Sequence, residues 1–195
     1  RSAERLAAGV TALEAKGIKA ASFQADLGSP PAVKALIGQV RQKLGPIGVL
    51  HWNAYSASAG DVLSADATAL QNVFDVAVAG LVTAVQESLA DLKQAKGAVL
   101  VTNGGLLFDD AKIDDAAAKR SLMGLAMGNA AKHKLVRLLS KQLEPDGVYV
   151  GEVTVLSAVK GTAWDNGSSK LEASAIAAKF WQIYTERREL SVSIG

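Results

Sequence analysis

Helical and extended patterns alternate along this chain, and the alternation restricts its fold more than any other feature. Apolar residues recur at helical spacing in five segments, at about residues 6–13, 30–44, 66–93, 121–143 and 176–183. Short apolar runs predict a strand after each helix, at residues 18–23, 47–52, 98–102, 148–156 and 190–194. Strands that alternate with helices predict an α/β fold with a doubly wound parallel sheet, here in a single domain over residues 1–195.

The first predicted helix follows no strand, although a parallel sheet needs a strand before each crossover helix. In nucleotide-binding folds that first strand leads into a glycine-rich turn, and no G-x-G-x-x-G occurs in the 195 residues. Either this strand-turn-helix unit lies before Arg1, or the protein lacks it. We favour an upstream unit, because losing a central strand would expose the apolar surface of its neighbours.

The composition argues against several classes of function. There is no cysteine, which excludes disulfides, thiolate nucleophiles and cysteine metal sites, and the two histidines lack metal-ligand spacing. The formal net charge of +2 argues against a nucleic-acid or membrane-surface partner. No uninterrupted apolar run approaches about 18 residues, so no membrane span is expected. Residues 1–6 do not resemble a signal peptide, and we expect a cytoplasmic protein.

A polar turn at Asn53 ends the apolar run that begins at Ile47. Ligands of open parallel sheets bind beyond the carboxyl ends of the strands, so this turn predicts a ligand site. Alternatively, the Asn53 side chain only caps its own turn.

Motifs in a fixed order resemble those of the short-chain dehydrogenase/reductase family along almost the whole chain. The start, residues 1–6, resembles the junction where a basic residue selects NADP, and Ala25-Asp26-Leu27 resembles the strand end that contacts adenine. Further similar segments are the N-N-A-G-like 52–55, the serine-bearing strand 97–104, the A-K-E-L-x-P-x-G-I-x-V-like 141–150, the P-G-x-V-like 155–159 and the I-A-x-x-[FY]-W-Q-like 175–182.

The resemblance implies an NAD(P)-binding Rossmann-like three-layer sandwich that oxidises or reduces a small carbonyl or alcohol substrate. It implies NADP rather than NAD, because Arg1 stands at the selecting position. It implies a homodimer or homotetramer paired through the helices at 66–93 and 121–143. The cofactor-binding positions it assigns are Arg1, Asp26, Leu27, Asn53, Ala54, Thr102, Asn129, Ser157, Val159 and Thr162.

The catalytic positions of the family are not kept. In the family a Tyr transfers the proton, a Lys lowers its pKa and a Ser orients the carbonyl, since a phenol of pKa about 10 is a poor base near neutrality. Aligned on residues 141–143, the Tyr, Lys, Ser and helix Asn positions hold Leu125, Asn129, Gly104 and Ala77. A one-residue slip would place Asn103 in the Ser position. Asn103 and Asn129 are therefore the candidate catalytic residues, and no metal site is expected.

Other polar and aromatic residues have simpler interpretations. We expect Tyr55 on the surface, His51 buried and hydrogen-bonded, and His133 on a solvated helix face with its lysine neighbours. Four aspartates, at 109, 110, 114 and 115, are expected in a solvated loop rather than around a cation. Trp164 lies where the family keeps its substrate lid.

Three functions stay open at this point. The first is an NADP-dependent oxidoreductase with a degenerate catalytic set, in which Asn103, Asn129 or Tyr55 supplies polar contacts. The second is a non-catalytic NADP-binding sensor or partner protein, which the loss of all four catalytic side chains favours. The third is an oligomer subunit without a cofactor, which the missing glycine-rich unit favours.

Overall fold

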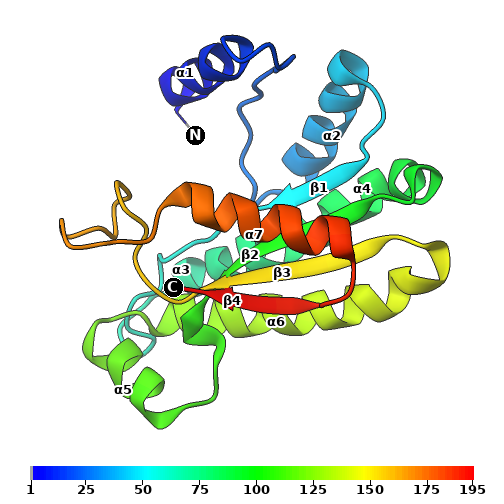
Figure 1. The fold of residues 1–195 in the computed structure, drawn as a ribbon. Coiled ribbons are helices and arrows are strands. Elements are labelled where there is room, and N and C mark those ends of the chain that lie inside the picture. The colour runs from blue at the N-terminus through cyan, green and yellow to red at the C-terminus, as the bar shows by residue number, and fades with distance from the viewer. Residues whose placement is uncertain (1) are drawn as a thin grey trace.

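The computed structural model describes residues 2–195 and contains a parallel sheet of four strands in the order β1-β2-β3-β4 (Figure 1). The strands are β1 (Val49–Trp52), β2 (Ala98–Gly104), β3 (Tyr149–Val155) and β4 (Ser191–Ile194). Trp52 pairs with Val101, and Gly104 pairs with Val155, so the carboxyl ends of the strands meet at one edge of the sheet. The predicted parallel α/β sheet is confirmed.

Helices cover both faces of this sheet. One face carries α2 (Pro30–Leu44), α4 (Gly80–Ala95) and α6 (Met123–Leu143), and the other carries α7 (Ala173–Glu186) (Figure 1). Alternate residues of β2 record this division: Val99 and Val101 face α4 and α6, whereas Ala98 and Leu100 face α7. Each strand in the order β1-β2-β3-β4 is added on the same side of the one before it. The helices that connect β1 to β2 and β2 to β3 lie on one face of the sheet, whereas α7, which connects β3 to β4, lies on the other. The β3–α7–β4 crossover therefore has the opposite handedness to the first two crossovers.

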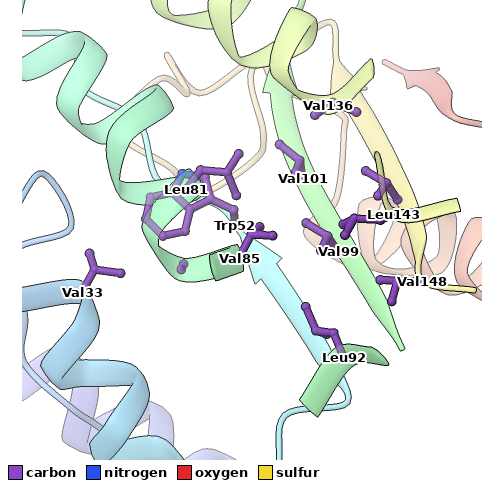
Figure 2. Packing of buried hydrophobic residues seen from close by; sticks show 12 residues of the cluster. Val33, Trp52, Leu81, Val85, Leu92, Val99, Val101, Val136, Leu143 and Val148 are labelled. Atoms are coloured by element: carbon purple, nitrogen blue, oxygen red, sulfur yellow. The ribbon is translucent and has the colours of Figure 1, made fainter. Parts of the chain in front are cut away.

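The larger core lies between the sheet and the α4–α6 face. Figure 2 shows Trp52 beside Leu81 and Val85 at the end of β1, with Val99 and Val101 to their right on the neighbouring strand β2. Leu81, Val99 and Val101 are completely buried. This packing holds the end of β1 against α4, and so fixes where the turn after Trp52 begins.

One long helical stretch runs from 67 to 95 as α3 (Ala67–Phe74), a π-helical turn (Asp75–Ala79) and α4. By length and composition it could cross a membrane, with a mean hydropathy of 1.5, although polar residues interrupt it. In the described residues it packs as a core helix does, with Leu81 and Leu92 fully buried against the sheet. Buried core helices of globular proteins can have the same length and apolar composition, so these two properties are weak evidence for a membrane span.

Two local predictions are wrong. Residues 18–23 do not form a strand, because β1 pairs only with β2 in the described chain and no neighbouring strand offers them hydrogen bonds. The aspartate-rich segment is not a loop: Asp110 accepts hydrogen bonds from Lys112 N and Ile113 N and caps α5 (Ala111–Lys119). All four aspartates are exposed, as predicted.

The first helix, α1 (Ala3–Glu14), buries no residue and lies apart from the sheet (Figure 1). Ser2 caps it by accepting a hydrogen bond from Arg5 N at 3.3 Å. Its apolar residues meet no strand in the described chain, so this helix is held by local hydrogen bonds rather than by packing.

Candidate functional site

The turn after β1 borders a cavity of about 260 Å³. Its lining residues come from this turn, from the segment before α2 and from the π-helical turn: Ala25, Leu27, Asn53, Ala54, Tyr55 and Val76. The indole N–H of Trp52 is buried beside the turn and has no hydrogen-bond partner. The predicted ligand position at Asn53 is therefore a hollow at the carboxyl end of a parallel strand, bounded by mixed polar and apolar groups.

A second, more open cavity of about 440 Å³ shares Ala25 with the first and is also lined by Gln24, Asp26 and Asn72. The Asp26 carboxylate accepts a hydrogen bond from Gly28 N at 3.0 Å and is otherwise exposed. The structure thus brings four of the predicted cofactor positions, Asp26, Leu27, Asn53 and Ala54, around two adjoining hollows. Arg1 lies outside the described residues.

Gly104 and Asn129 face each other where β2 ends against α6. A Cβ added to Gly104 would lie 2.8 Å from Asn129 Nδ2, so the asparagine amide fills the space that a side chain at 104 would need. Asn129 is 4% exposed. The two positions predicted from the alignment are adjacent in space, but neither carries a group that gains or loses a proton near neutrality.

Asn103 points into the protein rather than toward the turn. Its Nδ2 donates to Asn129 O at 3.0 Å and to Glu152 Oε1 at 2.8 Å, and its Oδ1 accepts from Gly104 N at 3.0 Å. These bonds use the amide group to fasten β2 to α6 and β3. The structure therefore gives Asn103 a structural position beneath the site.

Glu152, which the sequence analysis did not single out, is completely buried at the centre of this network. Its Oε2 lies 2.6 Å from His133 Nδ1 and accepts from Ser191 Oγ at 2.9 Å. The prediction of a solvated His133 was wrong, because its imidazole is turned inward to this carboxylate. Every carboxylate oxygen has a partner, so the network joins α6 to three strands.

Lys132 was also predicted to be solvated, and it is 2% exposed. Its Nζ donates to Ala54 O at 3.4 Å, directly under the Asn53 turn. Burial lowers the pKa of Lys132 from 10.5 to about 8, and the attraction of Glu152 opposes this shift. Its spacing from Asn129 and Leu125, three and seven residues, is the sequence pattern that could have placed it on the same helix face.

The π-helical turn carries Ala77, which the sequence predicts at the family's helix Asn position, against α6. Ala77 is 3% exposed, and a Cβ added to Gly128 would lie 3.6 Å from its Cβ and 2.8 Å from Val73 Cγ1. Small residues at 77 and 128 therefore let the two helices approach closely. Leu125, in the Tyr position, is half-buried on α6 and has no exchangeable proton.

The remaining predicted cofactor positions lie farther along the same edge of the sheet. Thr102 faces α7, where its hydroxyl lies 3.0 Å from His51 Nε2. Ser157, Val159 and Thr162 follow β3; Ser157 and Thr162 are exposed, and the Thr162 hydroxyl donates to Val159 O at 2.7 Å.

His51 is hydrogen-bonded as predicted but is exposed rather than buried. Its ring centroid lies 4.4 Å from that of Phe180. Partial desolvation of the ring lowers the pKa of His51.

The loop at 161–171 reaches back to the turn. Trp164 Nε1 donates to the Tyr55 hydroxyl at 2.8 Å, and both side chains are partly exposed. Tyr55 lies on the surface as predicted, and this bond places the loop over one end of the smaller cavity.

Within residues 2–195, no three His, Asp or Glu side chains are placed to hold a metal ion. The polar groups that the described residues bring to this region are amide, carbonyl, carboxylate and ammonium groups.

Known proteins share the architecture of this chain. The family model "short chain dehydrogenase" matches residues 1–168. A short-chain dehydrogenase/reductase variant from Serratia marcescens superposes with a TM-score of 0.86 at 18% identity, over 100% of this chain and 82% of its own. A Burkholderia cenocepacia short-chain dehydrogenase solved with NADP has a TM-score of 0.85 at 22% identity, and the match covers 100% of this chain and 82% of that protein. A Sphingobium yanoikuyae enzyme solved with NADPH gives 0.80 at 20% identity, over 99% and 75%.

None of the curated proteins matches the sequence. The solved structures, each under 25% identical, establish the fold, and the family model covers most of the sequence. This chain belongs to the short-chain dehydrogenase family.

Proposed function

We propose that this protein is an oxidoreductase of the short-chain dehydrogenase family that binds NADP(H) and acts on a small carbonyl or alcohol, within a single domain. The observation that carries the proposal is the pair of adjoining hollows at the end of β1, lined by Asp26, Leu27, Asn53 and Ala54. Structures of related fold are described as complexes with NADP or NADPH, which supports the choice of cofactor.

The lining suits the nucleoside part of such a cofactor. Asp26 offers a carboxylate to hydroxyl or amino groups, and the Asn53 turn offers an amide and backbone groups. Leu27, Ala54 and Val76 supply apolar wall against which a planar base can lie. No G-x-G-x-x-G phosphate turn occurs in residues 2–195.

When bound, the cofactor supplies a hydride, and the residues of this chain bind and orient the cofactor and the substrate. Asn129 presents a side-chain amide at the meeting point of β2 and α6, where it can donate to a substrate oxygen or a ribose hydroxyl. Ser157 and Thr162 are exposed beyond β3, where they can meet the other end of the ligand. The hydrogen bond between Trp164 and Tyr55 holds the 161–171 loop near the turn.

A carbonyl panel with NADPH tests this function in the full-length protein. We expect oxidation of NADPH above the blank with at least one aldehyde or ketone, and a loss of that activity in Asn129→Ala. No oxidation with any member of a broad panel would count against catalysis.

A second candidate is a non-catalytic NADP-binding protein, which Leu125 and Gly104 favour because neither transfers a proton. Saturable NADPH binding without turnover would support this candidate. Tryptophan fluorescence can report such binding, because Trp52 lies beside the turn.

We further propose a cytoplasmic homodimer or homotetramer. Met127 and Leu138 on α6 are 39% and 57% exposed, and such apolar groups suit a subunit contact along α4 and α6. Light scattering after gel filtration would give the mass, and a monomer at micromolar concentration would refute the assembly.

A further inference from the structure

Lys132 is a buried cation whose hydrogen-bonding capacity is mostly unused. An ammonium group has three N–H donors, and within residues 2–195 its one hydrogen bond is the 3.4 Å contact with Ala54 O. Burying a charge without full compensation is unfavourable, so packing alone does not account for a lysine at this position. A methionine would fill the same space.

The direction of the side chain explains why the charge lies at the turn. Helical side chains lean toward the helix N-terminus, so Lys132 extends along the positions one turn earlier, Asn129 and Gly128. Gly128 adds no side chain there, and Ala77 opposite is small. The stem therefore runs inside the protein to the underside of Ala54 rather than out to solvent.

Few charged groups face this ammonium. Glu152 on β3 attracts it at longer range, but Glu152 already accepts hydrogen bonds from Asn103 and Ser191 and lies 2.6 Å from His133. From the turn, the group that faces it is the Ala54 carbonyl. Because Ala54 also lines the smaller cavity, Lys132 meets the wall of the ligand site from the interior.

We propose that Lys132 is a positioning residue that holds the Asn53 turn from beneath and gives the ligand site its buried positive charge, so that the site favours an anionic nucleotide. This inference rests on the proposed nucleotide function and names the residue that tunes it. A charge shielded from water acts through a lower effective dielectric than a surface lysine does, so it is screened less by salt.

NADPH titration of the full-length protein tests the role in binding. The variants are Lys132→Met, Lys132→Gln and, as a matched control, Lys134→Met, because Lys134 is exposed on the same helix. We expect Lys132→Met to weaken NADPH binding roughly tenfold near neutral pH, and Lys134→Met to leave it within about twofold. Lys132→Gln keeps a donor without a charge, so it should recover less than half of that loss if the charge dominates. Lys132→Met binding as tightly as the wild type would overturn the proposal.

Hydrogen exchange at residues 53–58 tests the hold on the turn without any nucleotide. Lys132→Met should exchange faster there than the wild type, Lys134→Met should not, and Lys132→Gln should lie between them. Unchanged exchange in Lys132→Met would refute the positioning role even if its NADPH affinity falls. If the wild type does not bind NADPH, the proposed function fails, and the exchange rates still decide what Lys132 does to the turn.

Discussion

Replacing Lys132 by methionine should stabilise the fold while weakening the site. The pKa of Lys132 falls from 10.5 to about 8 on folding, chiefly through desolvation. Each tenfold change in proton affinity corresponds to about 1.4 kcal/mol, so keeping this lysine charged destabilises the folded state by about 3 kcal/mol. Losing the long bond to Ala54 O offsets about 1 kcal/mol of this. The expected net gain in Lys132→Met is therefore about 2 kcal/mol near neutral pH.

The pH dependence gives this prediction a sign that can be checked. Between about pH 8 and 10.5 the folded state has released the Lys132 proton while the unfolded state keeps it, so the wild-type free energy of unfolding rises with pH. The destabilisation is fully present below about pH 8 and disappears as the pH rises to about 10.5. Lys132→Met lacks the titrating group, so its advantage should shrink over that interval.

Urea unfolding of both proteins in steps across this pH interval measures the effect. The difference between the two curves isolates Lys132, because burial raises the pKa of Tyr149 to about 12 in both proteins and that contribution cancels. Lys134→Met should show neither the gain nor the pH dependence. A Lys132→Met protein that is less stable than the wild type, or a difference that stays constant with pH, would refute the reasoning.

Three further changes test the packing around the site. Glu152→Ala leaves the buried Asn103 amide and the Ser191 hydroxyl without their acceptor and should lower the free energy of unfolding by about 3 kcal/mol or more in urea titrations. Glu144→Ala, at an exposed ion pair, should change it by less than about 1 kcal/mol. Gly104→Ser should lower the free energy of unfolding by about 1–3 kcal/mol, because the new side chain would contact Asn129. Adding Asn129→Ala should recover part of that loss in a double-mutant cycle. Leu81→Ala should lower stability by about 2–5 kcal/mol, whereas Leu63→Ala, at a 92% exposed side chain, should leave the thermal midpoint nearly unchanged.

Periodicity and motif order were sufficient for the sheet and its helices, because those patterns depend on neighbours within the same segment. The run ending at Trp52 and the Val-rich run ending at Val155 both became strands. Residues 18–23 have a similar pattern but no strand beside them in the described chain. The sequence of one segment does not reveal whether a neighbouring strand is present to pair with it. The same limit applies to burial of polar residues. From the sequence, Lys132 and Glu152 look like ordinary exposed charged residues. They are buried because α6 packs against β3 in the folded protein.

The positions predicted to depart from the family pattern contact one another closely. The Asn129 amide occupies the space that a side chain at 104 would enter, and the missing side chain at Gly128 lets α6 approach Val73 and Ala77. Lys132, three residues after Asn129 on α6, places an ammonium group 3.4 Å from Ala54 O beneath the Asn53 turn. The contact leaves no room for a side chain at Gly104, and the Asn103 amide has hydrogen-bond partners for both its nitrogen and its oxygen. The described side chains around the Asn53 turn are therefore fitted to one another, and the groups they bring to the proposed site include a buried ammonium and a buried amide.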